Sequence, residues 1–310
     1  MKAQRLGGIL GAALLLFQIV QAIRSYQGMQ VLFQYPWLIL LALGLLCLST
    51  LQQMVAWSLL MRSLGVIIPW RALQRGYILS FLPRYIPGTV WGYLSRGEWL
   101  YQDYKVPYAI SNVGSLLEIS IAIFSNIVVM VLSIASRLTG FDRFLIIVML
   151  VITVFLVWWL LKKVLFSKRF VTNVSGDYSC FSFQVWLFCL LLITVNMFIY
   201  GASLYLTVLS LNISNISFSN ISLAFGTNWL PLTFTFSVAW LIGFLVFIFP
   251  SGLGLREVTL SGLLVANFGM TYENASTVSV LFRLWVTLAE LLWILLIGWH
   301  WIGKKFSRSI

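Results

Sequence analysis

Anion-binding residue types gather at two breaks in an otherwise apolar sequence. The first break reads Pro83-Arg-Tyr-Ile-Pro-Gly88, and the second reads Phe249-Pro-Ser-Gly-Leu-Gly-Leu-Arg-Glu257. Proline removes a backbone donor and glycine frees the backbone, so neither break is expected to continue an α-helix. A helix that starts at such a break presents unpaired N–H groups and the positive end of its dipole. Such ends bind anions, and phosphate is a common ligand.

The expected substrate-binding set combines these turns with nearby charged side chains. Its members are Arg84, Pro87, Gly88, Arg96, Glu118, Gly252, Gly254, Arg256, Glu257 and Arg283. Arginine suits bidentate contacts with phosphate because its guanidinium is planar and always charged. The glutamates could neutralise the arginines, hold a cationic part of a ligand or carry protons.

Each buried charge also has a structural interpretation. Glu118 and Arg283 could serve in an ion pair or a helix–helix hydrogen bond, since charges inside membranes are costly and often paired. Arg256 and Glu257 could stabilise the mouth of a helical hairpin. Arg96 could lie at the membrane interface and extend its guanidinium into the headgroup region.

Catalytic, metal and cofactor sites are not expected. The chain has one histidine, His300, and three cysteines, which leaves no metal-ligand cluster and no histidine-based triad. The phosphate-binding and dinucleotide-binding glycine motifs are absent from the sequence, so direct use of ATP or a dinucleotide is not expected. Any transport would then follow a gradient or equilibrate passively.

The composition indicates that lipid surrounds most of the chain. Of 310 residues, 61% are hydrophobic and 9% are charged, whereas soluble domains have about 25% charged residues. These values exclude a soluble enzyme, a secreted disulfide scaffold and a disordered chain. The net charge of +12 is explained by basic cytoplasmic loops, so nucleic acid is not an expected partner.

Six apolar stretches are long enough to cross a bilayer. They are Leu6–Ile23, Pro36–Met61, Pro107–Ala135, Phe144–Leu161, Gln184–Val208 and Ser276–Ile302. The first could instead be a signal peptide, because Lys2 and Arg5 precede its apolar run. Residues 72–100 and 229–266 contain the two breaks, and irregular backbone at membrane depth must be buried in protein or line a wet cavity. We therefore predict two broken, re-entrant hairpins.

The distribution of basic residues predicts the orientation. Lys2 and Arg5, the cluster at Lys162 and Lys163, and the basic C-terminal residues all lie on the cytoplasmic side if Lys and Arg follow the positive-inside rule. Both termini are then cytoplasmic, and the Asn-Ile-Ser tripeptides at 212–222 lie outside. The two hairpins enter from opposite sides.

The predicted fold is an all-α polytopic membrane protein, with six spans and two broken hairpins in one membrane domain over 1–310. Residues 36–161 and 184–302 form two halves of an inverted-topology repeat, each with a break, a charged half-helix and a span bearing a buried ionisable group. Paired, interrupted segments of this kind indicate a transport site near the bilayer midplane.

The two breaks also carry a resemblance. Arg84-Tyr-Ile-Pro-Gly-Thr-Val-Trp-Gly92, the span with Glu118, Pro250-Ser-Gly-Leu-Gly-Leu-Arg-Glu257 and the late Arg283 resemble the lysylphosphatidylglycerol synthase transmembrane-region family. The resemblance covers nearly the whole chain and implies a multi-pass domain that moves a lipid between leaflets. Because no transferase domain accompanies these segments in this sequence, lysyl-lipid synthesis is not expected. Free-standing relatives that accompany glycosyltransferases suggest polyprenyl-linked sugars as cargo, by analogy alone.

The sequence thus predicts a flippase-like transporter in the cell membrane whose partner is a lipid with a phosphate-containing headgroup. Two alternatives stay open. One is an accessory subunit that scaffolds a glycosyltransferase in cell-envelope glycolipid synthesis. The other is a membrane lipid transferase in which Glu118 or Glu257 acts as a general base.

Overall fold

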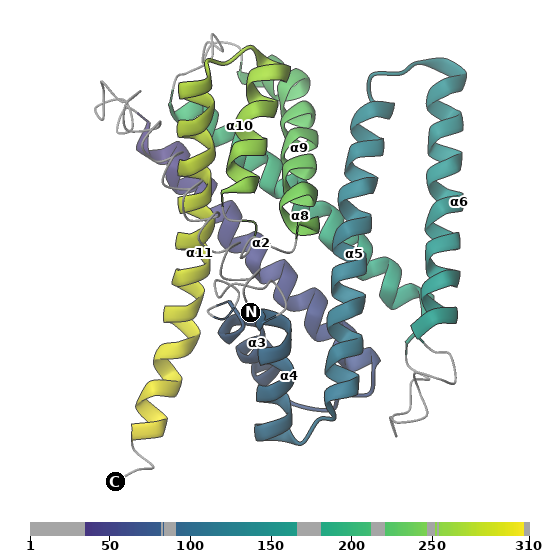
Figure 1. The fold of residues 1–310 in the computed structure, drawn as a ribbon, viewed down its shortest axis with the longest axis vertical. Coiled ribbons are helices and arrows are strands. Elements are labelled where there is room, and N and C mark those ends of the chain that lie inside the picture. Colours follow the sequence, from purple (N-terminus) through teal and green to yellow (C-terminus); the bar gives the residue numbers. More distant parts are fainter. Residues whose placement is uncertain are drawn as a thin grey trace.

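The computed structural model describes residues 35–81, 83, 91–165, 181–211, 221–246, 252 and 254–306. This part of the chain is helical and contains no strand (Figure 1). The helices are α2 (Pro36–Ser63), α3 (Trp70–Leu79), α4 (Trp91–Tyr104), α5 (Tyr108–Ala135), α6 (Gly140–Leu165), α8 (Phe183–Ser210), α9 (Ile221–Leu245), α10 (Leu255–Phe268) and α11 (Tyr272–Phe306). The predicted all-α class is confirmed.

Among the described residues, five helices are long and apolar enough to cross a membrane: α2, α5, α6, α8 and α11. Each coincides with one of the predicted spans, to within a few residues at its start. The remaining predicted span, Leu6–Ile23, lies outside the described residues. The protein is therefore a multi-pass helical membrane protein.

Prolines mark the starts of several helices. Pro36 is the first residue of α2, Pro69 immediately precedes α3, and Pro107 immediately precedes α5. Proline suits these positions because its missing N–H would have no partner in the first helical turn. Helix starts are therefore among the features that the sequence encodes locally.

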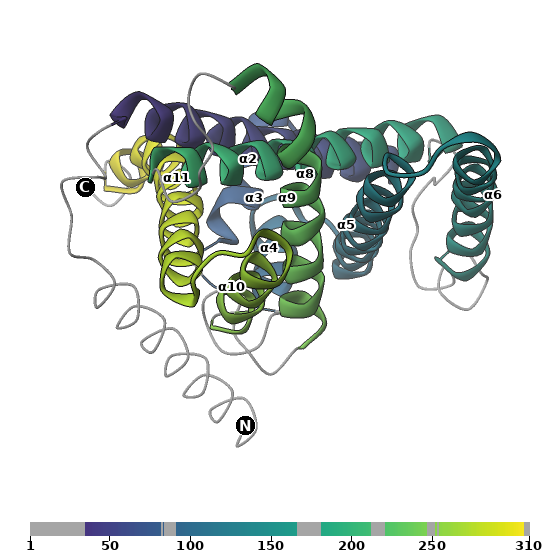
Figure 2. The same ribbon diagram turned by 90° about the horizontal axis from the view of Figure 1, so that it is seen from above.

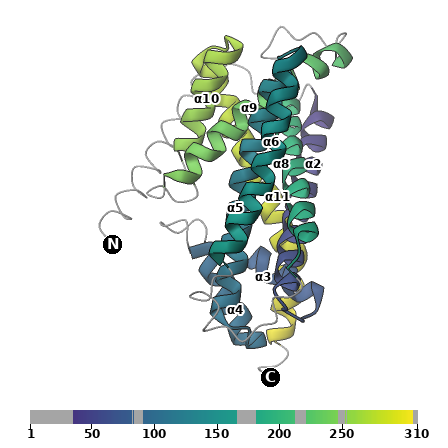
Figure 3. The ribbon, with the colours of Figure 1, turned by 90° about the vertical axis from the view of Figure 1, so that its right-hand side faces the viewer.

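Both segments with a predicted break contain a pair of helices. Residues 72–100 include most of α3 and the first part of α4, and residues 229–266 include the second part of α9 and most of α10. α3 and α4 lie near one end of the bundle and α10 near the other, as Figures 1 and 3 both show. α9 starts at Ile221 and includes Pro231, so this helix begins earlier in the chain than the predicted start at residue 229. The Asn-Ile-Ser tripeptides fall almost entirely outside the described residues.

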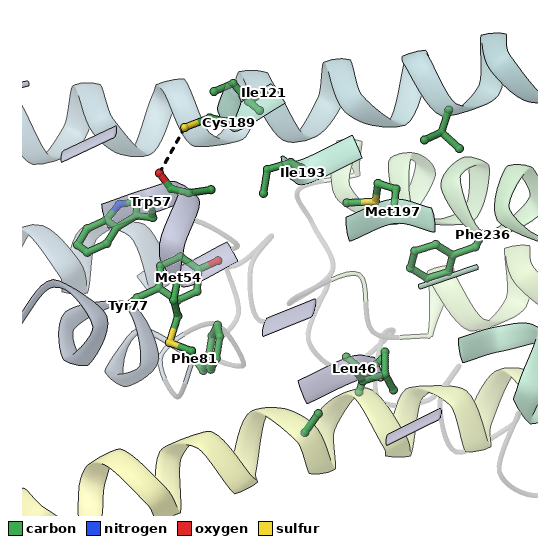
Figure 4. Packing of buried hydrophobic residues seen from close by; sticks show 14 of the residues in the cluster. Leu46, Met54, Trp57, Tyr77, Phe81, Ile121, Cys189, Ile193, Met197 and Phe236 are labelled. Atoms are coloured by element: carbon green, nitrogen blue, oxygen red, sulfur yellow. Dashed lines mark hydrogen bonds between the residues drawn. The ribbon is translucent and has the colours of Figure 1, made fainter. Parts of the chain in front are cut away.

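The centre of the molecule is an antiparallel pair of long helices, α2 and α8, which Figure 2 shows side by side. The Ser203 hydroxyl donates to the carbonyl oxygen of Ala42 (3.0 Å), and the Cys189 thiol donates to that of Ala56 (3.7 Å, Figure 4). Small side chains let the two backbones approach closely, which is how membrane helices associate without a hydrophobic driving force. Helices α3, α5, α9 and α11 pack directly on this pair.

Helix α6 lies at the edge of the molecule beside α5 (Figure 2), and its exposed side chains are largely apolar. No residue in its most apolar stretch is buried within the protein. Its end near α8 is attached by aromatic packing, because the Trp158 ring lies 5.2 Å from Phe181 and 5.6 Å from Trp186, between centroids. A helix with this exposed composition requires lipid around it.

Candidate functional site

The first buried ion pair joins the short helix α4 to the long helix α5. Arg96 Nη1 contacts Glu118 Oε2, and Arg96 Nε donates to the Ser80 hydroxyl at the end of α3 (2.7 Å). Only 1% of Arg96 is exposed. The interpretation that Arg96 extends to the membrane interface is therefore wrong: its side chain is buried in the bundle, where a carboxylate and a hydroxyl bind its Nη1 and Nε atoms.

Aromatic rings complete the enclosure of this guanidinium. Its central carbon lies 4.1 Å from the ring centroid of Tyr77, 5.2 Å from that of Tyr93 and 5.3 Å from that of Trp57. These distances are within the range of cation–π attraction, which is stronger where water is excluded. Figure 4 shows Trp57 and Tyr77 on neighbouring helices in this packed region. The charge of Arg96 is thus compensated within the protein.

A chain of polar side chains leads from Glu118 to helix α8. The Tyr77 hydroxyl lies 3.0 Å from Glu118 Oε1 and 3.1 Å from Gln53 Oε1, and its single proton donates to one of them at a time. Gln53 Nε2 donates to the Tyr200 hydroxyl (3.3 Å). The polar side chains next to the first ion pair are therefore linked by hydrogen bonds to Tyr200 on α8.

The second buried ion pair joins α10 to α11. Arg283 Nε lies 3.6 Å from Glu257 Oε1, and only 2% of the Glu257 side chain is exposed. Glu257 Oε2 accepts a hydrogen bond from the backbone N–H of Gly254 (2.7 Å). Glu257 is the third residue of α10, so its carboxylate satisfies a backbone donor that the helix start leaves unpaired, and it lies near the positive end of the dipole.

The turn before α10 requires glycine where it approaches α9. Gly252 has a φ of +69°, and a Cβ atom there would lie 2.8 Å from the carbonyl oxygen of Gly243. Gly243 in turn faces Arg256, because a Cβ on Gly243 would lie 3.0 Å from the Cβ of Arg256. The absence of both side chains lets the start of α10, and therefore Arg256, approach α9 closely.

Arg256 belongs to neither of these two ion pairs. Its guanidinium carbon lies 5.8 Å from the Trp240 ring centroid. Its Nε atom is buried and has no hydrogen-bond acceptor in the described part of the chain. Arg283, Glu257, Tyr200 and Glu290 lie within electrostatic range of it.

A cavity of about 100 Å³ lies between the two ion pairs and is lined by every described helix except α6. The polar and ionisable side chains that line it are Gln53, Tyr77, Tyr93, Glu118, Asn196, Tyr200, Trp240, Arg256, Arg283 and Glu290. Helical spacing explains the lining: Ile193, Asn196, Met197 and Tyr200 follow the three-to-four-residue repeat of one face of α8. The cavity is large enough for several waters or one small polar group.

The structure brings part of the predicted set together. Glu118, Arg256 and Arg283 line the cavity, whereas Arg96 and Glu257 lie behind it as ion-pair partners. Gly252 and Gly254 form the turn that positions Arg256. Arg84, Pro87 and Gly88 lie outside the described residues.

The structural interpretation of Glu118 and Arg283 holds in part. Each is in an ion pair, but they do not pair with each other: each contacts the short helix that precedes it in the chain. The polarity of the two pairs is reversed. The short helix supplies the arginine in the first pair and the glutamate in the second.

Sequence reasoning missed the contributions of α2 and α8. Gln53, Asn196 and Tyr200 lie in stretches apolar enough to be interpreted only as spans. The available signal was an amide side chain inside an apolar run, together with the spacing of four residues from Asn196 to Tyr200, which places both on one face. Polar residues inside membrane segments are by default functional candidates.

Among the described residues, no group of histidine, cysteine, aspartate or glutamate side chains could hold a metal ion. The cysteines Cys47 and Cys189 are free thiols. The chemistry that this arrangement offers is binding: guanidinium groups for an anion, and amide and hydroxyl groups for polar contacts.

No family model and no curated protein matches the chain in sequence comparison.

Proposed function

We propose that the protein is a flippase-like transporter that moves a lipid with an anionic, phosphate-containing headgroup between the leaflets of a cell membrane. The cavity carries this proposal: it has a polar lining, it lies between two helix pairs near opposite ends of the bundle, and two arginines, Arg256 and Arg283, line it. A guanidinium in a low-dielectric cavity attracts an anion far more strongly than it would in water. The acyl or prenyl tail would stay in lipid outside the bundle.

The arrangement of the two halves supports alternating access. Each ion pair joins a short helix to the long helix that follows it, one pair on each side of the cavity. In transporters built from inverted repeats, one half rocks against the other around a site near the midplane. We extend the proposal to membership of the lysylphosphatidylglycerol synthase transmembrane-region family, on the strength of the motifs around Arg84, Glu118 and Arg256.

A proteoliposome assay tests the proposal. Fluorescent phosphatidylglycerol and a fluorescent polyprenyl-phosphate sugar are followed separately as they become accessible to a membrane-impermeant quencher. The wild-type protein is expected to accelerate exchange of at least one lipid over empty liposomes. Arg256→Ala is expected to slow it by about tenfold or more, because a charge-assisted hydrogen bond contributes about 1.5–3 kcal/mol.

Arg137→Ala is the matched control, since Arg137 is exposed at the turn after α5 and lies outside the cavity. It should exchange lipid at the wild-type rate. Wild-type exchange no faster than that of empty liposomes would overturn the proposal. A new radiolabelled lipid product formed in detergent, where there are no separate compartments, would instead support a transferase.

A further inference from the structure

Asn196 is a fully buried amide whose polar atoms have no hydrogen-bond partner among the described residues. It is 0% exposed, and neither its Oδ1 nor its Nδ2 has a hydrogen-bond partner in the described part of the chain. It lies in the middle of α8 and lines the central cavity. A buried amide without a partner costs about 1–3 kcal/mol, so its placement requires a reason.

Some other buried polar side chains of the bundle bond to the preceding helical turn with at least one atom, whereas Asn196 is without a partner at both of its polar atoms. Thr194, two residues earlier on α8, donates to the carbonyl oxygen of Leu190 (2.8 Å). Asn126 on α5, also 0% exposed, donates from Nδ2 to the carbonyl oxygen of Ala122 (2.9 Å). This bond to the preceding turn is the ordinary solution for a polar residue inside a membrane helix. Asn196 does not adopt it.

Arg256 lines the same cavity, and its buried Nε atom likewise has no acceptor among the described residues. Tyr200 connects the two, because it lies one helical turn from Asn196 and within electrostatic range of Arg256. An unpartnered amide and an unpartnered guanidinium nitrogen thus line one cavity, near a second arginine, Arg283.

We propose that Asn196 and Arg256 form an oxyanion-binding subsite for a phosphate group, with Arg283 adding positive potential from α11. The Asn196 Nδ2–H and Arg256 Nε–H groups donate to two oxygens of the same phosphate. This subsite rests on the proposed function and deepens it by placing the anion against α8, α10 and α11. Arg96 is not a ligand in this scheme, because Glu118, Ser80 and three aromatic rings enclose it.

The donor set favours phosphate chemistry over recognition of a sugar alone. Arginine N–H groups donate and never accept, so a neutral hydroxyl gains less from them than an ionised oxygen does. The phosphate of a lipid headgroup and free inorganic phosphate share this chemistry. The test therefore treats them as separate ligands.

The experiment measures ligand-dependent thermal stabilisation of the purified full chain in detergent. The probes are inorganic phosphate, phosphatidylglycerol and, as the lipid without phosphate, diacylglycerol. Each titration gives an apparent dissociation constant, because a ligand that binds only the folded state raises its free energy of unfolding by RT ln(1 + [L]/Kd). The wild-type protein is expected to respond to phosphatidylglycerol or to inorganic phosphate, and not to diacylglycerol.

Asn196→Leu removes the amide while keeping a similar size, and Asn126→Leu makes the same change at a buried asparagine outside the cavity. Asn196→Leu is expected to weaken phosphate-dependent stabilisation by about tenfold, equivalent to about 1.4 kcal/mol. Asn196→Asp should abolish it through charge repulsion. Asn126→Leu should retain the wild-type dissociation constant, whatever its own melting temperature.

A wild-type dissociation constant in Asn196→Leu would overturn the subsite, as would an absence of any response in the wild-type protein. A response to phosphatidylglycerol alone supports a lipid phosphate as the ligand. A response to inorganic phosphate that is lost in Asn196→Leu supports the subsite even if the proteoliposomes show no lipid exchange. In that case the subsite stands and the proposed function fails.

Discussion

At the scale of single residues, the three described arginines near the cavity are held in three different ways. Arg96 is enclosed by Glu118 and aromatic rings, Arg283 contacts Glu257 at a longer distance, and Arg256 has no acceptor for its buried Nε. From residue type alone, the three arginines were expected to have the same role in binding a ligand. Their partners indicate that Arg96 is mainly structural, while Arg256 has most hydrogen-bonding capacity left for a ligand.

The ion pair of Arg96 and Glu118 is expected to stabilise the fold only as a pair. Arg96→Met should lower the free energy of unfolding by about 3–5 kcal/mol, because it leaves a buried carboxylate without its cation. Combining it with Glu118→Leu should restore much of this loss. A double-mutant cycle from unfolding in detergent measures the coupling. Simple additivity of the two single changes would contradict this expectation.

At the scale of helices, close crossings depend on glycine. A Cβ on Gly201 of α8 would lie 1.9 Å from the hydroxyl oxygen of Thr233 and 2.8 Å from its Cα on α9. Because one of these atoms belongs to the backbone, rotation of a side chain cannot relieve the overlap. Such contacts are typical of membrane helices, which associate through small residues.

Gly201→Ala is therefore expected to separate α8 from α9 and lower the melting temperature. The free energy of unfolding should fall by about 1–3 kcal/mol, as it does when a side chain is enlarged in a well-packed core. Gly44→Ala is the matched control on α2, because a Cβ there would meet nothing within 4 Å. Equal melting temperatures for the two variants would show that the crossing tolerates a methyl group.

The turn before α10 allows a second comparison at this scale. Gly252→Ala and Gly269→Ala both place alanine at a positive φ, +69° and +64°, but only position 252 meets the α9 backbone within 3 Å. Gly252→Ala should displace Arg256 and weaken phosphate-dependent stabilisation as well as lowering stability. Gly269→Ala should lower stability alone. Titration with the phosphate probes separates the two effects, and unchanged binding in Gly252→Ala would contradict the proposed positioning.

At the scale of the whole molecule, the arrangement of the helices gives a testable orientation. The start of α3 and the turn between α5 and α6 lie at opposite ends of the bundle (Figure 1). The positive-inside rule assigns Arg71 to the cytoplasmic side, which leaves Arg137 outside. Both residues are exposed.

A single cysteine at position 137 should react with a membrane-impermeant thiol reagent in intact cells, whereas one at position 71 should react only after permeabilisation. Cys47, Cys180 and Cys189 are first replaced so that each variant has one thiol. Labelling of position 71 in intact cells, with position 137 protected, would reverse the predicted orientation.

The sequence alone determined the class of the protein and the position of its long helices. About 20 apolar residues are needed to cross a bilayer, so the spans could be located from composition, and proline at positions 36 and 107 marked where two of them begin. The two interrupted segments also followed from local backbone chemistry. These features depend on neighbours along the chain.

Only the tertiary structure decided which charges pair and which line the cavity. Glu118 contacts Arg96 rather than Arg283, and Asn196 and Tyr200 reach the cavity from a helix whose sequence indicated only a span. The physical reason is that an ion pair or a cavity wall depends on how helices rotate and cross. Contacts between residues far apart in the chain, such as Gly201 with Thr233, fix those angles.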